Sequence, residues 1–108
     1  MRIYIASPYS KGDRLLNIRR AIEAGDKLFE MGHLPYIPHL LPFWHYVSPK
    51  PENTWMEMGR QWLECCDAVL RLDGESQGAD LEVEYAKKLG KKVYYSLHQV
   101  WARDVARA

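Results

Sequence analysis

The sequence predicts an α/β protein, a three-layer sandwich around a small parallel sheet of four to five strands. Short apolar segments alternate with longer segments of helical period, in the order β-α-β-loop-α-β-α-β-α. The chain has 108 residues, 47% of them hydrophobic and 27% charged, which is ordinary for a globular domain with a modest core. We therefore expect one domain over residues 1–108.

The first strand is expected at Arg2–Ala6, a short apolar run at the start of the chain. A loop follows, and Asp13 is a plausible N-cap for a helix that continues to about Met31. Asn17 lies off the charged side of this helix, so we expect its side chain to hydrogen-bond the preceding loop. Helical spacing predicts a buried face made of Leu15, Ile18, Ile22, Gly25 and Phe29.

A second strand is expected at 34–37, and the next segment, residues 38–54, is rich in proline and aromatic residues. A loop of this length in a small domain usually carries function or is disordered, and its aromatic content argues against disorder. We therefore interpret residues 38–54 as an aromatic lid over a site. A helix at 55–65 follows, with a predicted buried side of Met56, Gly59, Trp62 and Leu63.

The second half of the chain continues with a buried strand at 68–72, a turn-forming loop at 73–78 and a helix from Ala79 to Gly90. A further strand at 92–97 and a terminal helix at 98–108 complete a flavodoxin-like or Rossmann-like order. The loops that begin at Ser7, Pro38 and Asp73 all follow strands. In a parallel sheet they meet at the carboxyl edge, where such sheets bind ligands.

The helix after residue 78 contains one residue that breaks its pattern. Plotted at about 100° per residue, its side chains separate into a charged side and an apolar side, the latter made of Ala79, Leu81, Val83, Tyr85, Ala86 and Leu89. Glu82 falls in the middle of the apolar side, where an unpaired carboxylate is costly to bury. It either lines a cleft at the carboxyl edge of the sheet or is a first-turn glutamate stabilised by the helix dipole or loop amides.

Composition excludes several functional classes. The net charge of +1 gives no sign of a nucleic-acid or membrane-surface partner. The start of the chain lacks the apolar core of a signal peptide, and no apolar run approaches the roughly 18 residues of a membrane helix, so a cytoplasmic protein is expected. The adjacent cysteines, Cys65 and Cys66, do not suggest a disulfide.

Cofactor and metal signatures are also lacking in the sequence. There is no Walker phosphate loop and no dinucleotide fingerprint, so no cofactor is expected. No metal site is expected either, because the cysteines do not form a Cys-x-x-Cys pair and the histidines are not at metal-ligand spacing; these are His33, His39, His45 and His98.

The remaining polar candidates suit a flat, ring-bearing ligand, with or without a phosphate. Ser7 and Ser76 follow strands and could donate hydrogen bonds to phosphate oxygens, together with the amides of Ala79 and Asp80 at a helix start. The structural alternative for each serine is a loop-forming residue. The predicted contacts to the ligand are Ser7, Tyr9, Ser76, Gly78, His39 and Trp44.

Three segments together resemble the nucleoside 2-deoxyribosyltransferase superfamily. They are Ile3–Tyr9 with its Ala-Ser-Pro-Tyr, Cys66–Gly74, and Gly78–Ala86 followed by Gly-Lys-Lys-Val at 90–93. The likeness is greatest to small bacterial and phage members and covers nearly the whole chain except the lid. The Gly78-to-Glu82 spacing is weak alone but fairly specific beside the other two segments.

This resemblance implies that Glu82 attacks the anomeric carbon of a nucleoside and displaces the base, with water or a second base releasing the sugar. Transferases of the superfamily carry an Asp two residues before the Gly, whereas hydrolases of nucleoside 5′-monophosphates carry a Ser. Ser76 occupies that position, and Ser7 matches a second serine of the hydrolases. The resemblance therefore favours a nucleotide N-glycosidase over a base exchanger.

The chain departs from the superfamily at the second carboxylate, which assists departure of the base and lies eight residues before the Asp of the strand. Counting back from Asp67 gives Gly59. Glu57, Asp73 or a lid histidine could take over this role. A non-catalytic nucleotide-binding module is the alternative, and a core-only protein without a small ligand is a third reading.

Members of the superfamily also borrow a residue from a neighbouring subunit. The resemblance therefore implies a homodimer or a larger homo-oligomer. Trp101 and the terminal helix are candidates for that interface.

Overall fold

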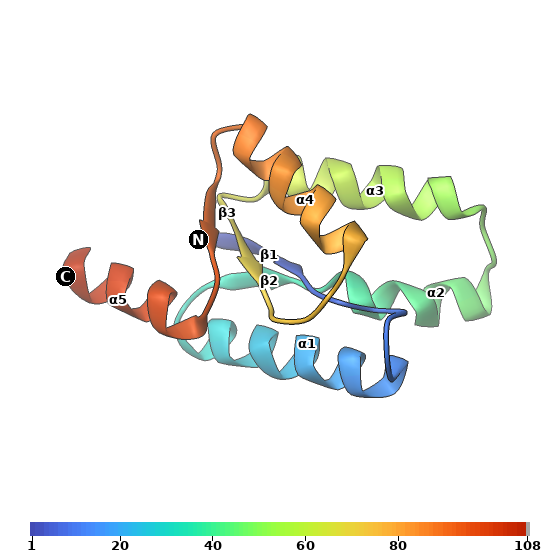
Figure 1. Ribbon diagram of the computed structural model, residues 1–108, viewed down its shortest axis with the longest axis horizontal. Coiled ribbons are helices and arrows are strands. Elements are labelled where there is room, and N and C mark those ends of the chain that lie inside the picture. The colour runs from blue at the N-terminus through green and yellow to red at the C-terminus, as the bar shows by residue number, and fades with distance from the viewer. Residues whose placement is uncertain (108) are drawn as a thin grey trace.

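The computed structural model describes residues 1–107, which form three layers around one parallel sheet (Figure 1). The strand order is β2-β1-β3-β4, and every pair is parallel. The four strands within the described residues are β1 (Arg2–Ala6), β2 (Leu34–Tyr36), β3 (Ala68–Arg71) and β4 (Lys92–Tyr94). The predicted α/β sandwich is confirmed.

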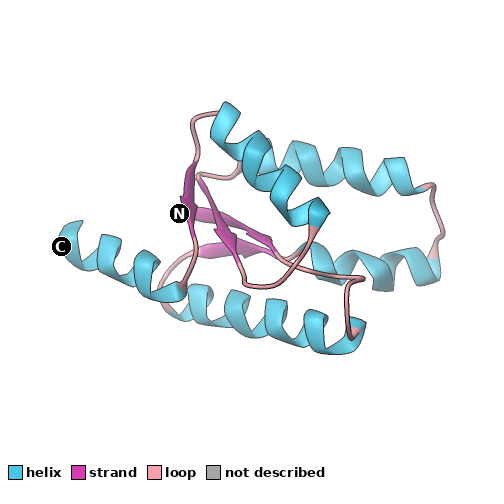
Figure 2. Cartoon of the chain, viewed as in Figure 1, coloured by secondary structure: helices cyan, strands magenta, loops and turns pink. Residues whose placement is uncertain are grey.

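Helices cover both faces of the sheet (Figure 2). On one face, α1 (Arg14–Glu30) and α5 (Leu97–Arg107) pack on side chains that include Ile3 and Ile5. On the other face, α3 (Glu52–Cys65) and α4 (Gln77–Lys88) pack on Tyr4 and Ala6. The alternation along β1 follows from the two-residue period of a strand, so one buried strand supplies both halves of the core.

The sheet contains a topological switch point next to β1, because β1 pairs with β2 on one side and with β3 on the other. The chain leaves β1 and β3 in opposite directions at the carboxyl edge, which opens a crevice between the two loops. The segment after β2 forms a short 3-10 turn, η1 (Pro38–Leu40), and a helix, α2 (Leu41–Val47). Figure 1 shows α2 and the first turns of α3 lying beyond this edge.

The segment predicted as an irregular lid is therefore helical, and α3 begins three residues earlier than expected. Pro38 and Pro42 lie in the first turns of η1 and α2, where proline fits because the first amides of a helix have no internal partner. The prediction failed because it treated proline as a mark of irregular structure. The aromatic side chains of this segment include exposed Phe43, Trp44 and Tyr46.

The predicted buried face of α1 is wrong at Leu15, Ile22 and Phe29, whereas Gly25 is buried and Ile18 is half-buried. Leu15 and Phe29 are 78% and 64% exposed, and Ile22 is also exposed. The face that packs on the sheet is made of small residues and one leucine: Asn17, Ala21, Ala24, Gly25 and Leu28. Small side chains let the helix approach the sheet closely, and this gain in contact outweighs the burial of larger side chains elsewhere.

The close approach of α1 can be tested at Gly25. A Cβ atom there would lie 2.5 Å from Cδ1 of the half-buried Ile37 and 3.4 Å from Cδ1 of Ile5 in the core. Gly25→Ala is expected to lower the free energy of unfolding by about 1–3 kcal/mol, measured by urea denaturation. Gly78→Ala, where an added Cβ meets nothing within 4 Å, is the control and should be neutral or slightly stabilising. Equal effects of the two substitutions would contradict the close packing.

Other differences are smaller. On α3, Gly59 and Leu63 are buried as predicted, whereas Met56 and Trp62 are exposed. Leu81 on α4 and Leu89, the residue after its end, are also exposed. The last strand ends at Tyr94, three residues earlier than predicted, and α5 begins at Leu97, one residue earlier than predicted. Residue 108, the predicted end of the terminal helix, lies outside the described residues.

Candidate active site

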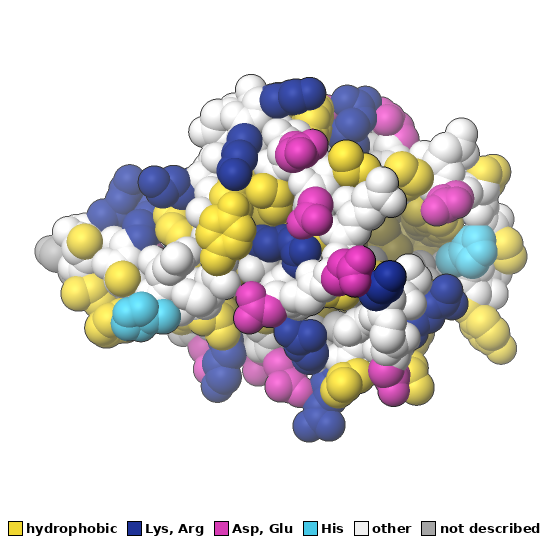
Figure 3. Space-filling model, in the orientation of Figure 1, with side chains coloured by type: hydrophobic (Ala, Val, Ile, Leu, Met, Phe, Trp, Pro, Cys, Tyr) yellow, Lys and Arg dark blue, Asp and Glu magenta, His cyan; other side chains and the backbone are white. Residues whose placement is uncertain are grey.

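A cleft of about 1330 Å³ opens at the carboxyl edge of the sheet. Its walls come from the end of β1 and the loop after it, from η1 and α2, from one side of α3, and from the first turns of α4. Figure 3 shows the molecule hollowed on the side of α2 and α3, with apolar side chains at the bottom of the hollow. The three strand-end loops expected to meet therefore contribute to one site.

Glu82 lies in the wall of this cleft, on the face of α4 that packs against the sheet. Its side chain is partly buried. The hydroxyl of Tyr4, which is 2% exposed, donates a hydrogen bond to Glu82 Oε2. Tyr4 projects from β1 toward α4 because strand residues alternate between faces, so sheet and helix together fix the carboxyl group.

Burial raises the pKa of Glu82 to about 7, although the Tyr4 hydroxyl and the charge of Arg71 act in the opposite direction. A carboxyl group with this pKa exchanges its proton near neutral pH. A carboxyl group with so perturbed a pKa in a cleft is a candidate for a reactive group.

Two polar atoms beside the end of β1 are buried without a partner. Ser7 is 6% exposed and its Oγ has no hydrogen bond, and His39 is 4% exposed with an unpartnered Nδ1. His39 Nε2 lies 2.8 Å from the carbonyl oxygen of Pro8, so this nitrogen carries the proton and Nδ1 is a bare acceptor. Both residues line the cleft, and unsatisfied buried polar groups there are suited to bind a polar ligand.

The first turn of α4 forms the opposite wall. Ser76 is its N-cap and accepts a hydrogen bond from the Ala79 amide at 3.1 Å. The preceding loop is held by Arg71, which donates to the Gly74 carbonyl at 2.8 Å and pairs with Asp80 at 3.0 Å. Gly74 has a φ of +119°, and a Cβ there would lie 2.8 Å from Pro8 Cγ, so the loops after β1 and β3 are in contact.

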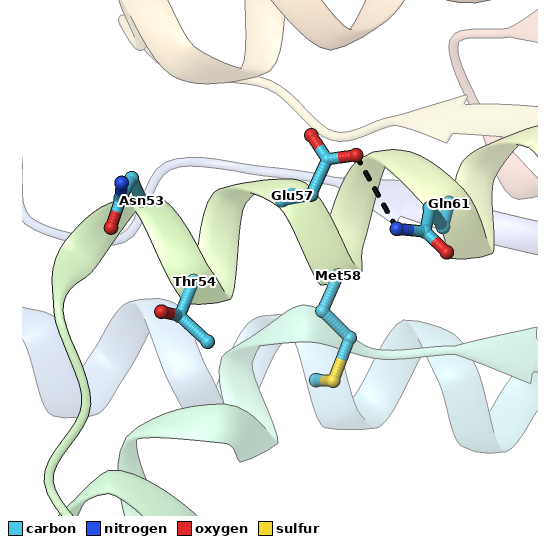
Figure 4. Close-up of a pocket in the computed structure, with 5 residues that line it drawn as sticks. All are labelled: Asn53, Thr54, Glu57, Met58 and Gln61. Carbon is cyan, nitrogen blue, oxygen red and sulfur yellow. Dashed lines mark hydrogen bonds between the residues drawn. The ribbon is translucent and has the colours of Figure 1, made fainter.

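The position of the second carboxylate faces the same site but carries no side chain. Gly59 on α3 lines the cleft, and a Cβ added there would meet only the Tyr4 hydroxyl oxygen, at 3.3 Å. Glu57 also lines the cleft, but its carboxylate is bound to Arg60, whose Nε lies 3.0 Å from Glu57 Oε2. Figure 4 shows Glu57 beside Gln61 in a second hollow of about 460 Å³ on α3.

The sequence matches a family model over residues 1–96, the family described as a domain of unknown function, DUF7768. The chain belongs to this family. No curated protein matches it. None of the helices within residues 1–107 of this DUF7768 domain has the length and apolar character to cross a bilayer.

Solved structures show which fold this DUF7768 domain shares. It superimposes on a 2-deoxyribosyltransferase from Bacillus psychrosaccharolyticus with a TM-score of 0.62 and 20% identity, covering 86% of this chain and 69% of that one. For the 2-deoxyribosyltransferase from Leishmania mexicana the TM-score is 0.64, the identity 19%, and the coverage 85% and 61%. The chain thus spans about two thirds of the length of these enzymes. The fold of the DUF7768 domain is nucleoside 2-deoxyribosyltransferase-like, as the three sequence segments suggested.

Most of the residues predicted from the sequence line the DUF7768 cleft. They are Ser7, Tyr9, His39, Glu57, Ser76, Gly78 and Glu82. Asp73 is exposed and Trp44 packs edge-on against Trp55 at 5.2 Å, and neither side chain is part of the cleft lining. Asn17 donates to the carbonyls of Tyr9 and Lys11, at 2.9 and 2.7 Å, so its predicted loop-holding role is confirmed.

Sequence reasoning missed several lining residues, above all Tyr4. Its period-2 position in β1 places it on the same face of the sheet as α4, which was a usable signal. Arg60 and Tyr85 were also missed, and they are joined by a hydrogen bond of 3.2 Å at the cleft wall. Within residues 1–107, no three His, Cys, Asp or Glu side chains are grouped as a metal site would require.

Proposed function

We propose that this DUF7768 domain cleaves or exchanges the N-glycosidic bond of a (deoxy)nucleoside or its 5′-monophosphate, with Glu82 as the nucleophile. The observation that carries the proposal is the Glu82 carboxyl group, which faces a large cleft and is held by the Tyr4 hydroxyl. The similar structures are 2-deoxyribosyltransferases, which supports this chemistry by analogy of fold.

The reaction would follow the logic of retaining glycosidases. The Glu82 carboxylate attacks C1′ of the sugar, the bond from C1′ to the base nitrogen breaks, and a glycosyl ester forms. Attack of water on C1′ then frees the sugar, whereas attack of a second base completes a transfer. Tyr4 would act as a positioning residue, because its hydroxyl fixes the carboxylate on the side of the ligand.

A phosphate would be held across the cleft from the base. Ser7 Oγ has no partner, Ser76 can donate its own hydroxyl proton while it caps α4, and the amides of the first helical turn are directed outward from the helix end. These donors support a nucleoside 5′-monophosphate as the preferred substrate. Hydrolysis is the expected outcome, because Ser7 and Ser76 match the serines of the hydrolases that the sequence resembles. The test is incubation with a panel of nucleosides and monophosphates, with free base measured by chromatography.

A non-catalytic nucleotide-binding module is the second candidate, and Gly59 favours it because no carboxylate stands at that position. The same panel separates the two functions. Retained binding of a monophosphate without any release of base would support the module. Release of base at a rate proportional to enzyme concentration would exclude it. The enzyme is expected to be a homodimer or larger assembly in the cytoplasm, which size-exclusion chromatography and fractionation can test.

The pH dependence of catalysis should report the environment of Glu82. Because the attacking form is the carboxylate, kcat/KM is expected to fall as the pH drops below about 7, the pKa of Glu82. The Tyr4 hydroxyl stabilises the carboxylate, so Tyr4→Phe should move the midpoint of the profile to higher pH. Tyr9→Phe is the control, since Tyr9 is not bonded to Glu82, and an equal shift in both variants would contradict the role of Tyr4.

A further inference from the structure

The leaving base presents a chemical problem that the cleft does not solve in the usual way. When a neutral nucleobase departs from C1′, its ring takes the electron pair of the broken bond and becomes an anion, unless another atom of the ring, such as N7 of a purine, is protonated as the bond breaks. A side chain that donates this proton needs a pKa near the working pH and must lie within hydrogen-bond reach.

Glu57 is unsuited as a proton donor. Its hydrogen bond to Arg60 lowers its pKa, so the group is ionised at neutral pH. The Arg60 guanidinium also bonds both carboxylate oxygens, and Gln61 donates to Oε1 at 3.3 Å. Glu57 therefore has neither a proton to give nor an unused oxygen with which to deliver one.

The histidine beside β1 is also unsuited. Burial lowers the pKa of His39, so the ring is neutral near pH 7. Its one ring proton is donated to the Pro8 carbonyl at 2.8 Å, and the free Nδ1 can only accept. His45 also lines the cleft. Its Nδ1 accepts a hydrogen bond from Trp55 Nε1 at 2.8 Å, so its ring proton is on Nε2, and a substitution of His45 is included in the experiment.

Two further positions considered from the sequence, Asp73 and Gly59, supply no acid. Asp73 is exposed and does not contribute to the cleft lining. Gly59 faces the Tyr4 hydroxyl, beside Glu82, with no side chain at all. The nucleophile is thus in place while the position opposite the leaving base is empty.

We propose that the substrate of this site is an N-glycoside whose leaving group is already a quaternised, positively charged nitrogen heterocycle, either a pyridinium or an N7-alkylated purine, on a ribose 5′-phosphate. This inference rests on the proposed function and names its substrate class. Such a ring leaves as a neutral molecule and requires no proton. The absence of a side chain at Gly59 then costs nothing in catalysis and leaves room for the ring.

The step balances without any further reactant except water. A Glu82 oxygen forms a bond to C1′, the bond from C1′ to the ring nitrogen breaks, and its electron pair neutralises the positive ring. Water then attacks C1′, the ester oxygen takes back its electron pair, and the proton of the water passes to solvent. The products are a neutral heterocycle, ribose 5′-phosphate and one proton.

The charges around the cleft agree with a cationic ring. Four carboxylates line it, those of Glu52, Glu57, Glu75 and Glu82, beside three cations, Lys11, Lys50 and Arg60. Lys11 lies 3.7 Å from Glu75 and Arg60 bonds Glu57, so these pairs cancel and the lining keeps one net negative charge when Glu82 is ionised. The indole of Trp55 adds an aromatic surface, which attracts a cation more strongly than a neutral base.

The test compares matched substrates that differ only in ring charge. GMP and 7-methyl-GMP share sugar and phosphate, and nicotinamide mononucleotide represents the pyridinium class beside AMP. Released base is measured by chromatography, with Glu82→Gln protein as the blank for spontaneous loss. We expect kcat/KM for a quaternised substrate to exceed that for its neutral counterpart by about 100-fold or more, the usual contribution of a general acid. If only one of the two quaternised probes is cleaved, that result identifies whether the substrate carries a pyridinium or an N7-alkylated purine.

A ratio within about 10-fold would overturn the inference while leaving the proposed function standing. Cleavage of none of the probes would overturn the inference, and the proposed function would fall with it only if the wider panel of nucleosides and monophosphates also released no base. If His45→Gln lost activity on GMP but kept activity on 7-methyl-GMP, His45 would be the missing acid and the inference would fail.

A gain-of-function variant tests the same idea from the other side. Gly59→Asp places a carboxyl group at the empty position, and it is expected to raise kcat/KM on GMP by about 10-fold or more with little change on 7-methyl-GMP. Gly59→Ala is the control for crowding at the Tyr4 hydroxyl, 3.3 Å from the added Cβ. Equal responses of both substrates to Gly59→Asp would contradict the inference, provided that the variant unfolds at the same urea concentration as Gly59→Ala.

Discussion

Glu82→Gln is expected to abolish release of the base, lowering kcat by roughly 1000-fold or more, and to leave the fold intact. A glutamine amide has nearly the shape of the carboxylate but does not attack a sugar carbon. Its Oε1 can still accept the hydrogen bond that the Tyr4 hydroxyl donates to Glu82. The measurement is free base by chromatography under single-turnover conditions, with far-ultraviolet circular dichroism to verify the fold.

Glu84→Gln is the matched control, because Glu84 is an exposed glutamate on the same helix, outside the cleft lining. Its kcat should stay within about twofold of the parent protein, as is usual for a surface substitution. Undiminished turnover by Glu82→Gln, or equal losses in both variants, would remove Glu82 from the reaction.

The position of Glu82 at the cleft could be predicted because a glutamate conflicts with its apolar neighbours on the helix. A glutamate among Val83, Ala86 and Ala79 breaks the helical pattern, and the structure places it at the cleft with a raised pKa. Such a pattern can be recognised in the sequence, because the side of a helix that faces a sheet is indicated by the spacing of neighbouring residues. The order of strands and helices could be predicted for the same reason.

Features that depend on distant contacts could not be predicted. The sheet-facing side of α1 is set by the space that Ile5 and Ile37 leave, which selects Gly25 and two alanines over larger apolar residues. The partnership of Tyr4 and Glu82 joins residues 78 positions apart. Helical spacing contains no information about either, because both arise only when separate elements pack.

The arrangement of the possible acids also required the structure. In the sequence, Glu57, Asp73 and the lid histidines were equivalent candidates for protonating the base. Their partners distinguish them: Arg60 bonds Glu57, the Pro8 carbonyl takes the proton of His39, and Asp73 faces solvent. The candidate nucleophile was thus accessible to pattern analysis, whereas the chemistry of the leaving group depends on hydrogen bonds formed in three dimensions.

The stability of the protein should depend on pH through the same carboxyl group. Burial raises the pKa of Glu82 from an ordinary value of 4.5 to about 7. Below pH 4.5 the group is neutral in both states. As the pH rises toward 7, the unfolded chain loses this proton before the folded one does, so folding becomes less favourable. Above pH 7 both states are ionised and the cost stays constant, at roughly 3 kcal/mol.

Glu82→Gln removes this cost, so the variant should be more stable than the parent protein at pH 8 by roughly 3 kcal/mol and nearly equal to it at pH 4.5. Urea denaturation at several pH values between these limits measures the difference. Glu57→Gln is the control with the opposite sign, because Arg60 lowers the pKa of Glu57 and the charged form is favoured in the folded state. A stability gain for Glu82→Gln that did not grow between pH 4.5 and 7 would show that the carboxylate is well solvated. Its nucleophilic role would then lose its physical basis.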